Sequence, residues 1–250
     1  FYSDIAVLSA GAISFGVYST SSPEETRYTV ERTEAKFFIA ENQEYVDKIL
    51  QSIAQYLFLL KIIVVDTSGT FMYNHEKLCS FSEIQDIGRK TKEENPGKLR
   101  ALIEKTRADD PAFLVFTSGT TGLPKPAVIS HQGILSSLVF AFSEFFPEIW
   151  NRQEKVVSHL SLAHIVERAF SIYFPLIYEW VPHVGEAIDY LQETIFEVQP
   201  TFFHGVPRIW EKFAAQIFVG IESSSRLKKA VYNRAMKIGW RYRETLWQGK

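Results

Sequence analysis

Hydrophobic and polar positions along the chain follow two spacings, one typical of buried strands and one typical of helices. Short apolar runs with the length of a strand occur at residues 13–18, 36–40, 62–65, 113–116, 156–160 and 201–204. Longer segments between them place apolar residues three or four apart, as at Tyr45, Ile49 and Ile53. Strands that alternate with helices predict parallel βαβ units, so we expect an α/β fold.

Local signals mark several helix ends. Ser22, Pro23 and Glu25 predict an N-cap, a first helical position and a capping box. The Pro96-Gly97 pair predicts a break in the helical segment 81–107. The segment 131–146 is apolar on most of its surface, so we expect it to be buried. Further helices are expected at 4–12, 43–57, 163–178, 186–198, from Pro207 onward and at 223–246.

Composition and charge exclude several classes of protein. The net charge of −2 gives no indication of a nucleic-acid partner. Cys79 is the only cysteine, which excludes an intrachain disulfide framework and favours a reducing compartment. No apolar run approaches the ~20 residues of a membrane span, and the first residues lack the basic segment of a signal peptide. We therefore expect a cytoplasmic globular protein.

The stretch from Phe113 to His131 carries the clearest chemical signal. After its apolar run it continues with Thr117, Ser118, Gly119, Thr120, Thr121 and Gly122, and then with Lys125. Glycines let backbone N–H groups turn toward an anion, hydroxyl groups add donors or a Mg²⁺ ligand, and lysine adds positive charge. Two alternatives are a flexible loop and a Walker phosphate loop. The Walker loop requires lysine directly after the last glycine, where this chain has Leu-Pro-Lys.

A second group of polar residues lies at 157–168. His159, His164 and Glu167 offer two imidazoles and a carboxylate at a predicted strand-to-helix turn. A zinc site on one helical face would have its histidines four residues apart, whereas these are five apart. A structural polar cluster at the helix start is the second alternative.

The sequence Thr117–Lys125, Thr-Ser-Gly-Thr-Thr-Gly-Leu-Pro-Lys, with the pair Ser130-His131 after it, resembles the phosphate loop of the adenylate-forming enzymes. Two more segments are similar to the long-chain fatty acid–CoA ligases of this superfamily. One runs from Leu160 to Arg168 and the other is Val-Pro-Arg-Ile-Trp-Glu-Lys at 206–212. The chain departs from the family pattern at Pro126, where glycine is usual, and at Ser161, where proline is usual.

The resemblance implies an α/β fold and a two-step reaction. A fatty carboxylate attacks the α-phosphate of ATP to give acyl-AMP and pyrophosphate, and the thiol of CoA then displaces AMP. ATP, Mg²⁺ and CoA are therefore the implied cofactors, and a long-chain fatty acid the implied substrate. By the same match His164 lies near the carboxylate and α-phosphate, Lys125 and the loop residues bind phosphate, and Thr117 is the metal ligand. His131 is expected to support the loop.

The family's later motifs, which bind ribose and supply a C-terminal lysine, are absent from residues 1–250. We therefore expect residues 1–250 to be part of the N-terminal AMP-binding domain, inactive alone. A ligase for another carboxylic acid and a non-catalytic nucleotide- or lipid-binding remnant are the alternatives. The basic residues of 223–246 suggest peripheral contact with a membrane, against the alternative of an ordinary solvated helix face.

Overall fold

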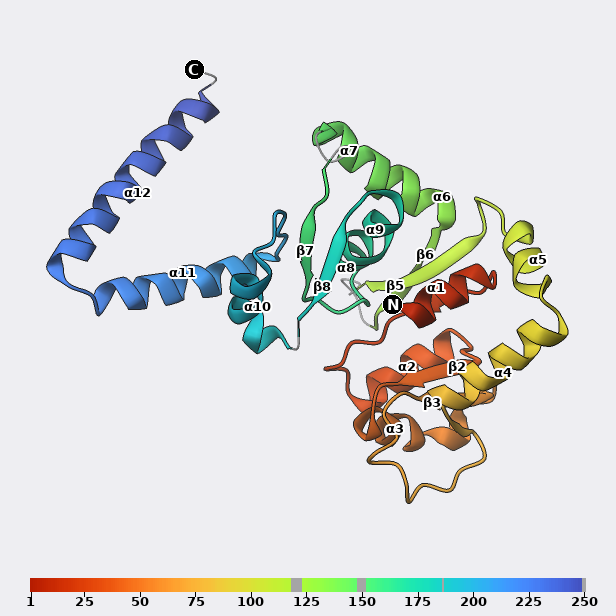
Figure 1. The fold of residues 1–250 in the computed structure, drawn as a ribbon. Coiled ribbons are helices and arrows are strands. Elements are labelled where there is room, and N and C mark those ends of the chain that lie inside the picture. The colour runs from red at the N-terminus through yellow and green to blue at the C-terminus, as the bar shows by residue number, and fades with distance from the viewer. Residues whose placement is uncertain (118–122, 148–151, 186, 249–250) are drawn as a thin grey trace. The chain divides into compact units, whose positions relative to one another are not determined.

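A computed structural model of the chain describes residues 1–117, 123–147, 152–185 and 187–248 (Figure 1). The chain divides into two compact units, Phe1–Thr201 and Phe202–Lys250. None of the described helices is long and apolar enough to cross a membrane. The α/β prediction is confirmed, because parallel strand pairs recur along the first unit.

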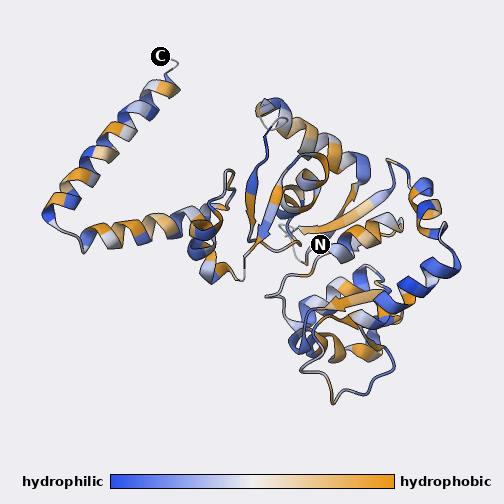
Figure 2. Ribbon diagram, viewed as in Figure 1, coloured by the Kyte–Doolittle hydropathy of each residue, from blue (hydrophilic) through white to orange (hydrophobic). Residues whose placement is uncertain are grey.

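One parallel sheet is formed by residues in the first third of the chain. Its strands are β2 (Phe37–Ala40), β3 (Lys61–Val64) and β4 (Leu78–Ser80), in that order. Strands β2 and β3 are connected through α3 (Gln43–Leu50) and the short η1 (Ile53–Gln55). Helix α2 (Pro23–Arg32) precedes β2. Figure 2 shows the apolar character of β2 and β3. Their side chains pack with those of the helices in a core that includes Val30, Val46, Ile49, Ile62 and Val64, each at most 2% exposed.

The start of α2 agrees with the sequence. The Ser22 hydroxyl accepts from the Glu25 N–H, and the Ser22 N–H donates to the Glu25 carboxylate at 2.9 Å. This reciprocal pair is the predicted capping box, with Pro23 at the first helical position. By contrast, α3 is shorter than the 43–57 expected from periodicity, because the chain leaves the α-helix after Leu50.

A second sheet has the order β1-β5-β6 and contains the strand that leads into the predicted phosphate loop. Strand β1 (Ser14–Phe15) runs parallel to β5 (Pro111–Thr117). Strand β6 (Lys125–Ser130) runs antiparallel to β5 and was not anticipated. The helices α1 (Tyr2–Ser9), α4 (Phe81–Glu94) and α5 (Lys98–Lys105) precede β5, and the predicted break at Pro96-Gly97 separates α4 from α5.

A parallel strand pair, β7 (Lys155–Ser158) and β8 (Val181–Val184), follows. They are joined through a continuous helical segment of α8 (Ile165–Arg168), the π-helical η4 (Ala169–Tyr173) and α9 (Phe174–Ile177). Phe170 and Phe174 of this segment pack against Phe142 and Trp180, with ring centroids 4.8–5.9 Å apart. The unit continues with η5 (Ile188–Tyr190) and α10 (Leu191–Val198).

Two sequence predictions in this part of the chain were wrong. The segment 131–146 forms α6 (His131–Ile134), the π-helical η2 (Leu135–Phe140) and α7 (Ala141–Phe145), but it is only partly buried. Phe145 is 80% exposed, because an apolar surface is buried only where another element covers it. The strand expected at 201–204 does not form. Thr201 alone pairs with Lys155, through its N–H and its hydroxyl, and one residue is too short for a strand.

The second unit is a pair of helices, α11 (Pro207–Glu222) and α12 (Arg226–Trp247). Pro207 occupies the first turn of α11 as predicted, and Ser225 caps α12 through its hydroxyl. The two helices contact each other, with Phe218 against Tyr232 at 6.2 Å between ring centroids. Most apolar side chains of α12 are exposed, among them Leu227, Val231 and Ile238.

Candidate functional site

The β5–β6 hairpin positions the two ends of the predicted phosphate loop. Ala112 and Phe113 anchor β5 in the core with no exposed surface, and the strand ends at the exposed Thr117. Lys125 opens β6 directly opposite Thr117 in the strand register. The Thr117 hydroxyl donates to the Lys125 carbonyl at 3.4 Å. The hairpin therefore brings two predicted site residues together at one end, while Ser118, Gly119, Thr120, Thr121 and Gly122 lie outside the described residues.

The prolines around Lys125 fit this geometry. Tyr28 of α2 donates its hydroxyl hydrogen to the Pro124 carbonyl at 3.0 Å, which ties the loop's exit to a neighbouring helix. Pro126 lies in β6, at the edge of the β1-β5-β6 sheet. Proline is tolerated in an edge strand, because an N–H on the outer side of such a strand has no neighbouring strand to bond, and its absence removes no hydrogen bond of the sheet. The replacement of the usual glycine by Pro126 is thus compatible with an exposed Lys125.

His131 lies at the start of α6, immediately after β6. Its backbone N–H donates to the Asp110 carbonyl at 3.2 Å, and Ser130 caps the helix by accepting from the Gly133 N–H. Asp110 also accepts from the Arg107 N–H, so the acidic pair 109–110 forms a turn before β5. The His131 side chain is half-buried, and its role in supporting the loop stays a prediction.

His164 sits on a tight turn between β7 and α8. It is the N-cap of α8, and its Nδ1 accepts from the Val166 N–H at 3.2 Å. A neutral ring with an accepting Nδ1 carries its proton on Nε2, so Nε2–H remains available as a donor. Ser161 shapes the turn: its hydroxyl accepts from the Ala163 N–H and its carbonyl from the His164 N–H. Only the bond to the hydroxyl is specific to serine, because a proline at position 161 would keep the carbonyl and lack the hydroxyl.

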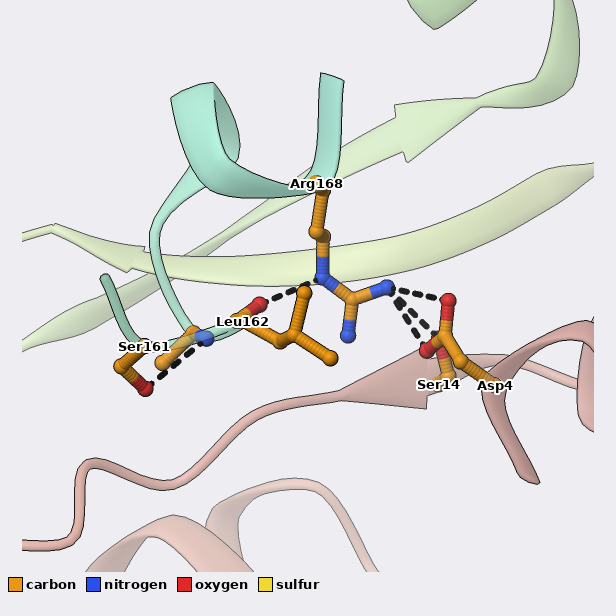
Figure 3. A network of polar contacts seen from close by, with 6 residues as sticks. Asp4, Ser14, Ser161, Leu162 and Arg168 are labelled. Atoms are coloured by element: carbon orange, nitrogen blue, oxygen red, sulfur yellow. Dashed lines mark hydrogen bonds and ion pairs between the residues drawn. The ribbon is translucent and has the colours of Figure 1, made fainter. Parts of the chain in front are cut away.

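The residues after His164 form a buried polar network, whose contact with Asp4 of α1 was not predicted from the sequence (Figure 3). Arg168 is 2% exposed and bonds Asp4 of α1 at 2.7 Å, while its Nε donates to the Leu162 carbonyl at 2.7 Å. Glu167 is fully buried and accepts from the Ser158 hydroxyl at 2.6 Å. A Glu-Arg pair inside an otherwise apolar helical segment was the signal in the sequence that pointed to it.

The zinc alternative drew on His159, His164 and Glu167. Glu167 also accepts from the Leu160 N–H and the Ser171 hydroxyl, so its carboxylate is tied to the protein on several sides. Among the described residues, no group of three metal-ligating side chains includes His164. The alternative of a polar cluster that organises the helix start describes Glu167 and Arg168 well.

The structure places the His164 turn beside the carboxyl end of β1, which runs parallel to β5. Strand β1 pairs with β5, with Ser14 opposite Phe113. Directly after β1, a Cβ on Gly16 would lie 2.6 Å from the Cα of Ala163, which places the His164 turn against the β1 end. Tyr173 packs on Phe113 at 5.9 Å between ring centroids, and burial raises the pKa of its phenol, which stays neutral. Loops at the carboxyl ends of parallel strands are the usual ligand sites of such folds.

Comparison with known proteins identifies relatives of this chain. The family model for the AMP-binding enzyme matches residues 1–239. A long-chain-fatty-acid–CoA ligase of Homo sapiens, ACSBG2, is 30% identical over 254 residues, which cover 100% of this chain and 37% of the relative. The Bos taurus protein ACSBG1, with the same enzyme name, is 32% identical over 225 residues, covering 87% of this chain and 30% of the relative. The chain thus spans about a third of the length of these relatives.

Solved structures give the same fold at low identity. The adenylation domain of a carboxylate reductase from Mycobacterium chelonae superposes with a TM-score of 0.58 at 18% identity, covering 89% of this chain and 35% of that domain. Coronafacic acid ligase from Pectobacterium brasiliense gives a TM-score of 0.59 at 16% identity, covering 89% of this chain and 40% of its own. The match of the family model to nearly the whole sequence shows that this chain belongs to the AMP-binding enzyme family.

Proposed function

We propose that this chain is part of a long-chain fatty acid–CoA ligase, which converts a fatty acid to acyl-AMP and then to acyl-CoA. The observation that carries the proposal is the pairing of Thr117 and Lys125 at one hairpin end, with the His164 turn against the same sheet. The relatives at 30–32% identity carry the name long-chain-fatty-acid–CoA ligase, which supports this substrate class over shorter or aryl acids.

The residues at the hairpin end fit a nucleoside triphosphate with Mg²⁺. Thr117 presents a hydroxyl and Lys125 an ammonium group, both exposed. Hydroxyl oxygens suit Mg²⁺, and an ammonium group is a point charge for phosphate oxygens. When bound, Mg²⁺ neutralises phosphate charge that develops during transfer. A structural neighbour, MatB from Rhodopseudomonas palustris, was solved with bound ATP and superposes with a TM-score of 0.56.

Each residue has a distinct proposed role. Lys125 holds phosphate oxygens and Thr117 supplies an oxygen to the metal, with Ser118, Gly119, Thr120, Thr121 and Gly122 completing the cradle. His164 donates from Nε2 to the acid's carboxylate or the α-phosphate, because its Nδ1 is already an acceptor. CoA enters in the second step, through residues of the longer protein.

We assign residues 1–250 to the large N-terminal domain of such an enzyme. The family match over residues 1–239 and the greater length of the relatives support this assignment. The proposed site then draws on further segments of the longer protein for ribose and CoA.

An exchange assay tests the function directly. The full-length protein is incubated with ATP, Mg²⁺, labelled pyrophosphate and one acid at a time: palmitate, octanoate or benzoate. We expect ATP–pyrophosphate exchange that is fastest with palmitate and depends on Mg²⁺. Fastest exchange with benzoate would favour a ligase for another acid, and no exchange with any acid would favour a non-catalytic binding protein.

Membrane contact through α12 is a second proposal, carried by a separate observation. The helix holds seven basic residues and one acidic residue. Arg234, Lys237 and Arg241 recur at helical spacing beside an exposed apolar stripe: Leu227, Val231, Ile238, Tyr242 and Leu246. A basic flank beside an apolar stripe is the pattern of helices that lie on anionic lipid surfaces. Such a surface would keep the protein near its fatty acid.

A further inference from the structure

The polar network around Arg168 joins three parts of the first unit. The Arg168 Nη1 donates to both Asp4 carboxylate oxygens, at 2.7 and 2.8 Å, and to the Ser14 hydroxyl at 3.2 Å. Its Nε donates to the Leu162 carbonyl at 2.7 Å, two residues before His164 (Figure 3). One side chain thereby connects α1, β1 and the turn that carries the imidazole.

The guanidinium is also stacked. Its carbon lies 4.8 Å from the centroid of the Phe113 ring, and Phe113 is fully buried in β5. Asp4 is 10% exposed at its side chain, so the ion pair is almost entirely removed from water. Arginine suits such a place because its planar fork donates in several directions at once, which a lysine ammonium on one nitrogen does not reproduce.

Stability alone is a poor reason for a buried ion pair. Apolar residues of similar volume are often equally stabilising, because two charges must leave water to form the pair. The ion pair instead defines a geometry. Asp4 orients the guanidinium, and the Arg168 Nε–H then fixes the position of the Leu162 carbonyl. The turn is held on its other side by Gly16 against Ala163 and by Glu167 against Ser158.

We infer that Arg168, oriented by Asp4, is a positioning residue that sets the place of the His164 imidazole. The inference rests on the proposed function, since the position of the imidazole matters for catalysis only if His164 takes part in the proposed reaction. Arg168 itself is buried and touches no substrate; it acts through the Leu162 carbonyl. A loosened turn would displace the imidazole, and displacements near 1 Å cost about a hundredfold in rate.

Two variants of the full-length protein separate positioning from stability. Arg168→Lys keeps the charge beside Asp4 but loses the simultaneous bond to Leu162. The double variant Arg168→Met with Asp4→Leu replaces the ion pair by apolar contact. We expect both to melt near the wild-type temperature, with a kcat for palmitate-dependent pyrophosphate release lowered at least about tenfold and the KM for ATP little changed.

Hydrogen exchange supplies a readout independent of turnover. We expect the amides of residues 162–166 to exchange faster in both variants than in the wild type, while Arg100→Lys, in an exposed ion pair with Glu104, serves as the matched control. A folded variant with wild-type kcat, or with unchanged exchange at 162–166, would overturn the positioning role. If neither variant folds, Asp4→Asn, which removes the negative charge that orients Arg168, replaces them under the same criteria.

Failure of the proposed function can be distinguished from failure of the positioning role of Arg168. A wild-type protein that releases no pyrophosphate with any acid overturns the proposed function. The exchange comparison then still decides whether Arg168 holds the turn, because it requires no turnover.

Discussion

At the scale of single residues, Lys125 offers the most direct test of the phosphate site. Its side chain is exposed, and the residue lies between two prolines at the start of β6. An exposed lysine contributes little to stability, typically ~0–1 kcal/mol through ion pairs. A lysine bound to polyphosphate makes charge-assisted hydrogen bonds whose loss costs about 1.5–3 kcal/mol.

We therefore expect Lys125→Ala in the full-length protein to lower kcat/KM for ATP roughly ten- to a hundredfold at an unchanged melting temperature. Pyrophosphate release against ATP concentration measures the effect. Lys90→Ala, at an exposed lysine of α4, is the control for loss of charge. Wild-type kinetics in Lys125→Ala would remove the phosphate role from this residue.

His164 allows its structural and chemical roles to be separated. The imidazole caps α8 through Nδ1, and asparagine is among the preferred N-cap residues. We expect His164→Asn to fold like the wild type but to lose about ten- to a hundredfold in kcat, the worth of a hydrogen bond to a charged group. His164→Ala should lose activity and also melt earlier, because the cap is gone. Equal activity of wild type and His164→Asn, measured by pyrophosphate release, would contradict the assignment.

At the scale of elements, α4 shows how one cap makes stability depend on pH. Ser80 and Glu83 form a capping box, and the Ser80 N–H donates to the Glu83 carboxylate at 2.6 Å. That bond holds the pKa of Glu83 below its usual range. A lowered pKa in the folded state means that the bond stabilises above the pKa of unfolded glutamate, about 4.3. The stabilisation is lost as the pH falls through the lower, folded value.

We expect hydrogen exchange in the first turn of α4 to accelerate relative to the Glu83→Gln variant as the pH falls from about 5 to about 3. Both proteins are compared at each pH, which cancels the intrinsic change in exchange rate. Glu25→Gln in α2 serves as a control with an unperturbed α4 cap. A constant ratio between wild type and Glu83→Gln across this range would show that the bond does not contribute.

The basic flank of α12 makes membrane contact testable by charge reversal. Each basic residue near an anionic surface contributes about 1 kcal/mol, so reversing three should weaken binding at least about a hundredfold. The variant is Arg234→Glu with Lys237→Glu and Arg241→Glu. Its control, with the same change in net charge, is Lys90→Glu with Lys92→Glu and Lys98→Glu.

Sedimentation with phosphatidylserine vesicles at low salt compares these full-length proteins. We expect the control to bind like the wild type and the α12 variant to remain in solution. If wild type binds neutral and anionic vesicles equally, the solvated helix face is the correct reading of α12.

At the scale of the whole molecule, the length of the relatives suggests what this chain does alone. It covers 37% of the human relative and divides into two units, one of them a pair of helices. We expect the 250-residue chain to form no acyl-CoA from palmitate, ATP and CoA, since ribose and CoA binding are assigned to further segments. Chromatographic detection of palmitoyl-CoA, with the full-length protein as positive control, makes the comparison. Product above the buffer level would refute the expectation.

The sequence by itself determined the features that depend on neighbouring residues. Ser22, Pro23 and Glu25 form their cap within one turn, and α4 ends just before Pro96-Gly97. The apolar run 113–116 predicted β5, and the motif after it identified the family. These signals are local, because a hydrogen bond three residues away or a missing N–H acts in any tertiary context.

Only the tertiary structure decided which segments meet. Strand β6 exists because β5 lies beside it as a partner, whereas Thr201 pairs with Lys155 and residues 201–204 form no strand. Arg168 and Asp4 are 164 positions apart, and neither periodicity nor spacing marks a partner at that distance. Periodicity shows that a helix has an apolar side, but not whether anything covers it, so Phe145 and the stripe of α12 are exposed. Side-chain burial and strand pairing depend on contacts between segments that are distant in the sequence, so only the tertiary structure determines them.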